Sequence, residues 1–187
     1  STDVDMIEMN ISCPNVKSGG VQFGTSCESV GSITNAVRKH CTKPLIVKLS
    51  PNVTDIAEIA KSAEANGADA ISMINTLTGM RIDINTKRPI IRNNTGGMSG
   101  PAVFPVAVRM VWQVSNAVKI PIIGMGGIST WQDAVEMMIA GASALQIGTV
   151  FFSDPYAPIK IAEGINEYLD KNGMKSVTEL TLSLIHI

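Results

Sequence analysis

The chain lacks the features that mark several specialised classes of protein. Its 187 residues contain no apolar run long enough for a membrane-spanning helix, and a net charge of −1 argues against a broad basic surface for nucleic acid. Its three cysteines, Cys13, Cys27 and Cys41, do not have the spacing of metal or iron–sulfur ligands. We therefore predict a reduced, cytoplasmic protein with no metal site and no membrane or nucleic-acid partner, in which Cys27 and Cys41 are packed as small core residues.

The order of apolar patterns predicts a parallel α/β sheet. The composition is ordinary for a globular domain, with 45% hydrophobic and 17% charged residues. Short apolar runs alternate with helical patterns along the chain. The predicted strands, nearly all apolar as in a sheet covered on both faces, are residues 6–11, 45–49, 70–74, 120–124 and 144–147. The predicted helices are residues 29–40, 55–65, 103–118, 132–139 and 157–172.

Several of these helices carry end signals. Thr54 is placed to cap the helix at residues 55–65, and Thr130 with Asp133 resembles a capping box at the start of the helix at residues 132–139. Gly67 and Gly141 are placed to end these same two helices.

Both an open doubly wound sheet and a (β/α)8 barrel fit this order of elements. Polar or glycine residues end nearly every strand, whereas an open sheet would gather them at one crevice. Glycine-rich turns end the last two strands, which is the phosphate-binding position of a (β/α)8 TIM barrel. We therefore predict an incomplete TIM barrel with about the last five βα units, since a whole barrel has ~250 residues. Without the other units, residues 45–49 and 144–147 should expose apolar side chains.

The first strand leads into the segment Asn10-Ile11-Ser12-Cys13-Pro14-Asn15. At the carboxyl end of a parallel strand, this segment would place a thiol and two carboxamides at the active-site edge of the sheet. The carboxamides can bind a planar polar ligand. Cys13 could be a metal ligand, a nucleophile, a general base or a packed thiol. No partner lies at metal-ligand spacing, and His40 and His186 fall in a helix end and the C-terminal tail, which leaves the general base.

Two glycine turns predict a phosphate site. Residues 124–128 read Gly-Met-Gly-Gly-Ile, and Gly148-Thr149 follows the last strand. Glycine lets backbone N–H groups approach an anion closely, and a following helix adds a favourable dipole. Tight turns with no ligand would explain either segment alone, but the two together favour a bound phosphate.

Lys48 and Asn75 are polar residues at the ends of apolar strands. A charge inside an apolar strand is costly unless it is paired. Lys48 is therefore either part of a salt bridge at the end of the barrel or a cation that faces electron-rich atoms of a cofactor, such as the N1/O2 edge of a reduced flavin. Asn75, followed by Thr76, would share a planar ligand with Asn10 and Asn15. The connection at residues 76–100 is long enough to be a lid or binding loop.

Together these segments resemble the class 1 dihydroorotate dehydrogenases. Residues 10–15 are similar to the catalytic loop of that family, and residues 47–52 to its flavin-contacting lysine strand. Residues 75–83 and 96–102 resemble the NAD-linked subtype, class 1B, and residues 124–128 and 148–149 resemble the FMN phosphate loops. The resemblance covers about residues 3–180.

The resemblance implies a chemistry for the named residues. Cys13 would remove the C5 proton of dihydroorotate while the C6 hydride passes to N5 of FMN, and orotate would leave, as in pyrimidine biosynthesis. The pyrimidine would be bound by Asn10, Asn15, Asn75 and Thr76. The FMN would be held by Asn10, Lys48, Ile74, Gly100, Gly126, Gly127, Gly148 and Thr149.

The resemblance also implies partners and a domain arrangement. The subtype works as a homodimer with an electron-transfer subunit that carries FAD and a 2Fe–2S cluster and reduces NAD. Residues 1–180 would be the C-terminal part of a single FMN-binding TIM-barrel domain, and residues 181–187 a tail unlike the family. We expect the chain on its own to be inactive, because the family's N-terminal barrel units supply part of the site.

Two alternative functions stay open. The pyrimidine-reducing domain of dihydropyrimidine dehydrogenases, which acts on uracil and thymine, shares the core of the catalytic loop, but it tends to have His at the position of Asn15. The other alternative is a non-catalytic barrel that only binds FMN or another phosphate ligand, against which the presence of Cys13 argues.

Overall fold

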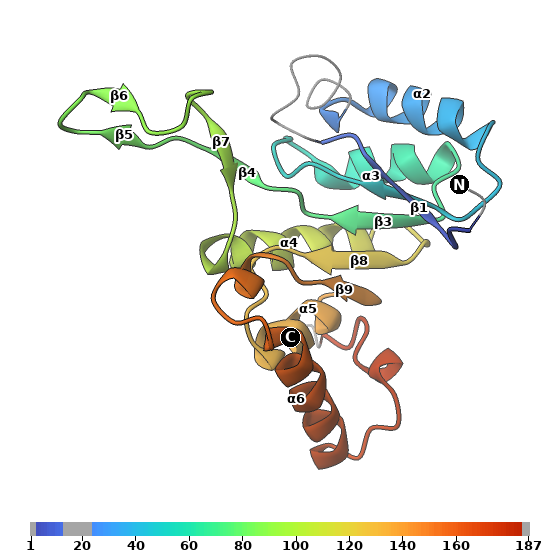
Figure 1. The fold of residues 1–187 in the computed structure, drawn as a ribbon. Coiled ribbons are helices and arrows are strands. Elements are labelled where there is room, and N and C mark those ends of the chain that lie inside the picture. The colour runs from blue at the N-terminus through green and yellow to red at the C-terminus, as the bar shows by residue number, and fades with distance from the viewer. Residues whose placement is uncertain (1–2, 13–23, 185–187) are drawn as a thin grey trace.

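The computed structural model describes residues 3–12 and 24–184, so Cys13 and Asn15 lie outside the described residues. All five predicted strands form: β1 (Ile7–Asn10), β2 (Leu45–Lys48), β3 (Ala70–Met73), β8 (Ile122–Met125) and β9 (Ala144–Gln146). They make one parallel sheet in the order β1-β2-β3-β8-β9 (Figure 1). β8 begins two residues later than predicted, after Pro121, which has no N–H to donate to the sheet.

The helices also follow the prediction, with shifted ends. They are α2 (Cys27–Arg38), α3 (Ile56–Ala65), α4 (Phe104–Ser115), α5 (Trp131–Ile139) and α6 (Ala157–Lys171), with short 3-10 turns at Pro101–Val103, Thr149–Phe152 and Val177–Glu179. The capping box of Thr130 and Asp133 is confirmed. Gly67 and Gly141 follow the caps of α3 and α5 with φ of +101° and +125°, as helix-ending glycines do.

The predicted cap of α3 is wrong. Asp55, not Thr54, is the N-cap, and its carboxylate accepts hydrogen bonds from the backbone N–H groups of Ala57 and Glu58 at 2.9 and 3.2 Å. The helix starts one residue later than predicted, so Asp55 lies just outside the first turn, where a carboxylate also interacts favourably with the helix dipole.

The strand order decides between the two predicted architectures. Each strand lies beside the next one in the chain, so successive crossovers all move in the same direction across the sheet. Because such crossovers are right-handed, they place all the helices on one face. Accordingly α2 packs on α3, α3 on α4, α4 on α5 and α5 on α6. A doubly wound sheet would need the strand order to reverse, so this is an arc of a (β/α)8 barrel.

The two faces of the arc differ in chemistry. The face under the helices carries the core, where Leu45, Val47, Ile71 and Met73 are all completely buried. The opposite face corresponds to the inside of the barrel. There the register aligns Asn10 with Lys48, so polar side chains replace the apolar ones near the strand ends.

Two predictions about exposure need correction. The side chains of residues 45–49 are not exposed: Leu45, Val47 and Leu49 are fully buried because β2 lies between β1 and β3 and under the helices. The edge strand β9 is partly exposed, as predicted. Cys41 is buried as predicted, but Cys27 is exposed, because it is the first residue of α2 and lies outside the core.

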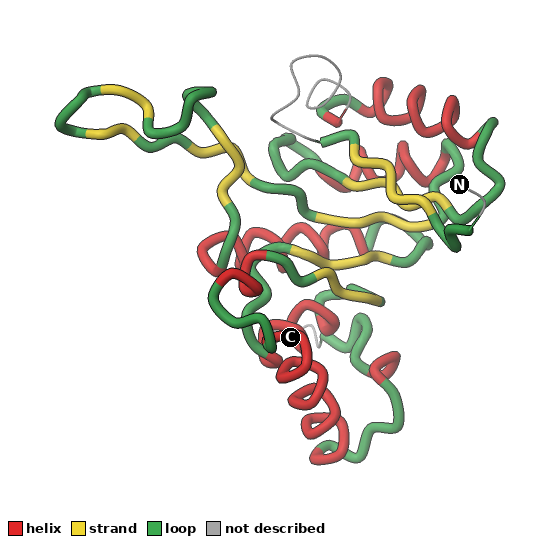
Figure 2. The backbone as a smooth tube through the Cα atoms, in the orientation of Figure 1, coloured by secondary structure: helices red, strands yellow, loops and turns green. Residues whose placement is uncertain are grey.

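The long connection at residues 76–100 forms an arm that projects from the body of the molecule (Figures 1 and 2). At its base β4 (Leu77–Gly79) pairs antiparallel with β7 (Gly96–Met98), and at its tip β5 (Ile82–Asp83) pairs with β6 (Arg88–Pro89). The tip turn is held by Asp83, whose carboxylate accepts hydrogen bonds from the N–H groups of Asn85 and Thr86. These bonds hold the pKa of Asp83 below its ordinary value.

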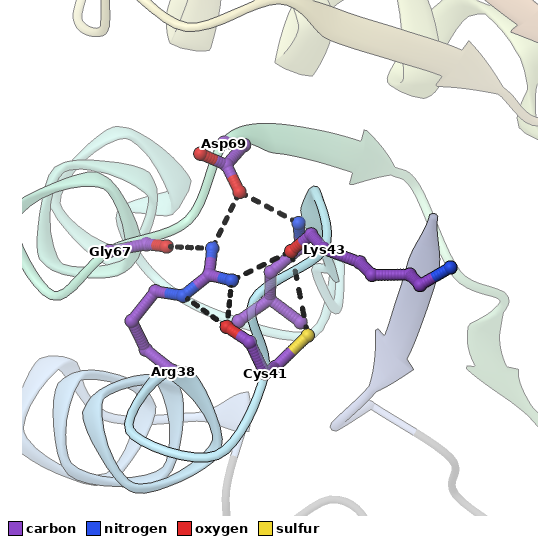
Figure 3. Close-up of polar contacts among 6 residues, drawn as sticks. Arg38, Cys41, Lys43, Gly67 and Asp69 are labelled. Atoms are coloured by element: carbon purple, nitrogen blue, oxygen red, sulfur yellow. Dashed lines mark hydrogen bonds and ion pairs between the residues drawn. The ribbon is translucent and has the colours of Figure 1, made fainter. Parts of the chain in front are cut away.

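At the amino ends of the strands, Arg38 joins two loops (Figure 3). Its guanidinium donates to the backbone oxygens of Cys41, Lys43 and Gly67 and pairs with Asp69 at 2.6 Å. The same carboxylate oxygen of Asp69 accepts a hydrogen bond from the N–H of Leu45, at 2.8 Å, and the N–H of Asp69 donates to the Leu45 oxygen. This network fixes the loops that lead into β2 and β3. Among the helices of the described residues, none is long and apolar enough to cross a membrane.

We predict that Arg38→Met destabilises the fold by about 2–4 kcal/mol, because several backbone oxygens lose a charged donor at once. The measurement is chemical unfolding followed by circular dichroism in a complete catalytic subunit. Arg109→Met is the matched control, since the exposed Arg109 donates its hydrogen bond to Gln113 on the same helix and joins no loops, and it should change stability by no more than about 0.5 kcal/mol. Equal effects of the two substitutions would contradict the structural role of Arg38.

Candidate functional site

A cavity of about 220 Å³ lies at the carboxyl ends of the strands. It brings together nine of the residues singled out in the sequence: Lys48, Ile74, Asn75, Thr76, Gly100, Gly126, Gly127, Gly148 and Thr149. These residues come from the ends of β2, β3, β8 and β9 and from the segment between the arm and α4. The carboxyl ends of parallel strands meet at one edge, so this is where a barrel places its ligand.

Asn10 reaches the same site through a hydrogen-bonded network. The side-chain amide of Asn75 donates to the Ser12 hydroxyl at 2.6 Å and to Oδ1 of Asn10 at 3.3 Å. Ser12 donates from both its backbone N–H and its hydroxyl to Oδ1 of Asn10, each at 3.1 Å. With Oδ1 occupied in this way, the Nδ2 group of Asn10 is left as a donor toward a ligand. Ser12 was not among the predicted site residues; its signal was its place between Asn10 and Cys13.

The base of the arm is tied to the site by Asn52. Its side chain donates to the backbone oxygen of Thr76 at 3.0 Å and accepts from the N–H of Thr78 at 2.9 Å. Gly97 packs against the other side of Thr76 so closely that a Cβ there would collide with the threonine side chain. Thr76 is therefore held from both sides. Asn52 was also missed as a supporting residue, although it follows the turn after the lysine strand.

The glycine turns have the geometry that a phosphate needs. Gly126 and Gly127 have φ of +123° and +81°, where side chains are strained, and a Cβ on Gly127 would lie 2.7 Å from the oxygen of Gly100. A Cβ on Gly148 would meet nothing within 4 Å, so its surroundings are open. Within the described residues, no hydrogen bond occupies the backbone N–H of Gly126, Gly127 or Gly148. Free donors beside open space suit an anion.

The helices after these turns differ from the prediction. A short 3-10 turn, Thr149–Phe152, follows Gly148, and α6 begins only at Ala157. The first N–H groups before and within α5 are taken by its own capping box. A phosphate here would therefore depend on the N–H groups of the turns more than on a helix dipole.

Lys48 forms the predicted salt bridge, and its position at the cavity leaves the second interpretation a prediction. Its ammonium lies 3.7 Å from a carboxylate oxygen of Glu8, and it also lines the cavity. The other oxygen of Glu8 accepts a hydrogen bond from the side chain of Gln146, at 2.8 Å. A cation, side-chain amides and free N–H donors gathered around one cavity together fit a flavin mononucleotide better than an uncharged ligand. The binding roles of the individual residues remain predictions.

Among the described residues, no group of three or more His, Cys, Asp or Glu side chains is placed to hold a metal ion.

Comparison with known proteins agrees with this arrangement. A family model described as dihydroorotate dehydrogenase matches residues 2–169. The catalytic subunit of dihydroorotate dehydrogenase B (NAD(+)) from Bacteroides fragilis is 62% identical over 177 residues, which are 95% of this chain and 58% of that protein. The subunits of the same name from Parabacteroides distasonis and Alkaliphilus oremlandii are 60% and 57% identical, again over 95% of this chain. The chain spans somewhat more than half the length of these curated relatives.

A solved structure confirms the fold. The crystal structure of DHODH from Eimeria tenella in complex with ferulenol superposes with a TM-score of 0.80 at 23% identity, over 95% of this chain and 54% of that one. The incomplete barrel predicted from the strand order is thus confirmed. With the family model matching most of the chain and relatives more than half identical, the chain belongs to the dihydroorotate dehydrogenase family.

Proposed function

We propose that this chain is part of the catalytic subunit of an NAD-linked, class 1B dihydroorotate dehydrogenase, which oxidises dihydroorotate to orotate in pyrimidine biosynthesis. The observation that carries the proposal is the cavity, which gathers Lys48, Asn75, Thr76 and both glycine turns in one place. The high identity to subunits named for this activity supports it.

The carboxamides would bind the pyrimidine. Asn75 is oriented by Ser12, and Asn10 has its oxygen occupied, so both present fixed groups to a ring that carries amide and carboxylate functions. Thr76 is held by Asn52 and Gly97. Asn15 would complete the set, and Cys13, which follows Ser12 in the chain, would take the C5 proton; both lie outside the described residues. Such positioning is a large part of what an active site contributes to rate.

The remaining residues would hold FMN. Gly126, Gly127, Gly148 and Thr149 would donate to its phosphate, Gly100 and Ile74 would border the cofactor with Asn10, and Lys48 would lie beneath its polar edge. When bound, FMN supplies the acceptor for the C6 hydride. Lys48 contributes a fixed positive charge where negative charge accumulates on reduction.

We further propose that the catalytic subunit forms a homodimer and passes electrons to a partner subunit with FAD and a 2Fe–2S cluster. The arm supports a protein partner, because it exposes the apolar side chains of Met80, Ile82, Ile84, Ile90 and Ile91. The free thiols of Cys27 and Cys41 support a reducing, cytoplasmic location.

The proposal predicts that Cys13→Ala, in a complete catalytic subunit, retains FMN but reduces it with dihydroorotate ~10²–10⁴-fold more slowly, because the general base is lost. Stopped-flow absorbance of the flavin measures the rate. Cys13→Ser should recover part of the rate only at high pH, because an alcohol gives up its proton less readily than a thiol and becomes an effective base only as the pH rises. Cys41→Ala, at a buried cysteine away from the cavity, is the matched control for the loss of a thiol.

Near-normal reduction in the Cys13→Ala variant would contradict the assignment of the base. Reduction of uracil in preference to oxidation of dihydroorotate by the wild-type protein would favour the dihydropyrimidine dehydrogenase type instead. Bound FMN that neither substrate reduces or oxidises would favour a non-catalytic barrel.

The second prediction concerns the phosphate turns. Gly127→Val should yield protein that purifies without flavin, because the branched side chain collides with Gly100 and Phe104 and moves the turn. The ratio of flavin to protein absorbance measures the outcome. Gly173→Val is the control, at another glycine of positive φ, where a Cβ meets nothing within 4 Å and which is not among the residues that line the cavity. Full flavin content in Gly127→Val would place the phosphate elsewhere.

A further inference from the structure

Three side chains on the inner face of the sheet form a connected polar group: Glu8 on β1, Lys48 on β2 and Gln146 on β9. Lys48 and Gln146 line the cavity, whereas Glu8 does not. One oxygen of Glu8 lies 3.7 Å from the Lys48 ammonium, and the other accepts the Gln146 amide at 2.8 Å. The side chains of Lys48 and Glu8 are only 20% and 27% exposed, so the ion pair is partly shielded from solvent.

The contact between Glu8 and Gln146 joins the two edge strands of the sheet, which is the geometry of a barrel. In the register of the sheet, Glu8 lies beside Ile46, and Ile46 lies beside Ala70. When this row is continued across β8, it reaches position 142, just before β9 and four residues before Gln146. A barrel with a shear of about eight staggers its eight strands by about one residue per strand, or about four across this sheet. Glu8 and Gln146 therefore lie at the same height and meet across the barrel axis.

This layer is unusual in its chemistry. Barrel interiors are filled by layers of side chains from alternate strands, mostly branched and apolar. β1, β3 and β9 are alternate strands here, and two of them contribute a carboxylate and an amide. On the inner face of the five described strands, Glu8 and Lys48 are the charged residues. Asn10 and Ser72, the register neighbours of Lys48, are uncharged, so on this face the ion pair of Lys48 is with Glu8.

We propose that Glu8 is a positioning residue that holds the Lys48 ammonium at the wall of the cavity, and that Gln146 holds Glu8 from the opposite side of the barrel. This inference rests on the proposed function, because it concerns the flavin that Lys48 would face. Breaking the contact would let the flexible lysine side chain move away from the cavity, and the flavin would lose the charge that stabilises its reduced form.

The test uses a complete catalytic subunit with FMN and the variants Glu8→Leu, Glu8→Gln, Lys48→Met and the double variant Glu8→Leu with Lys48→Met. The reduction potential of the flavin is measured by titration with dithionite against a reference dye, and FMN affinity by the change in flavin fluorescence. Glu58→Gln is the control for loss of one carboxylate, because Glu58 pairs with Lys61 on the exposed surface of α3.

We expect Glu8→Leu to lower the potential and weaken FMN binding toward the values of Lys48→Met. The double variant should match Lys48→Met alone, because Glu8 acts through Lys48. Glu8→Gln keeps a single acceptor oxygen, which can serve Lys48 or Gln146 but not both in the present arrangement, so its potential should lie above that of Glu8→Leu. If both Glu8 variants raised the reduction potential of the flavin equally, whether or not Lys48 was present, the lost negative charge of Glu8 would be acting on the flavin directly. That result would overturn the proposal. An unchanged potential in Glu8→Leu would overturn it as well.

If Glu8→Leu does not fold, Gln146→Leu replaces it, since that variant leaves both charges in place. If Gln146→Leu lowers the reduction potential of the flavin by less than Lys48→Met does, and if this decrease disappears when Lys48→Met is also present, the proposal is supported. Any other result overturns it. A wild-type protein without FMN would defeat both proposals. A wild-type protein that binds FMN but is not reduced by dihydroorotate would defeat only the proposed function, because the titration with dithionite does not require the substrate.

Discussion

The parallel pairing of neighbouring strands is the constraint on which the rest of this structure depends. Because every strand runs the same way and each crossover moves one step in the same direction, all carboxyl ends meet at one edge and all helices lie on one face. The apolar side chains of β2 and β3 are buried under the helices. The inner face is then left for polar residues near the strand ends, which is where the cavity forms.

The cavity is supported by residues that do not themselves line it. Ser12 orients Asn75, Asn52 holds the backbone around Thr76, and Glu8 pairs with Lys48. Each supporting side chain is bonded to at least two partners, which fixes it more firmly than one contact would. This is how a barrel can keep a site rigid although its residues come from loops at the ends of several strands.

The arm and the Arg38 network serve opposite ends of the barrel. Arg38 and Asp69 fix the loops at the amino ends of β2 and β3, where contacts stabilise the fold and take no part in the cavity (Figure 3). The arm leaves the body at the carboxyl ends, next to Thr76, and carries exposed apolar side chains. A partner bound to the arm would therefore lie close to the site.

The sequence by itself determined the strands, the main helices, the capping box at Thr130 and the family, because apolar periodicity and local motifs depend on nearby residues. It did not determine the cap at Asp55, since Thr54 and Asp55 are adjacent and both suit a cap. The buried state of residues 45–49, the exposure of Cys27 and the supporting roles of Ser12, Asn52 and Glu8 were decided only by the tertiary structure. Those properties depend on which strand lies beside which. Glu8 and Gln146 are far apart in the chain, and only the stagger of the barrel brings them into contact.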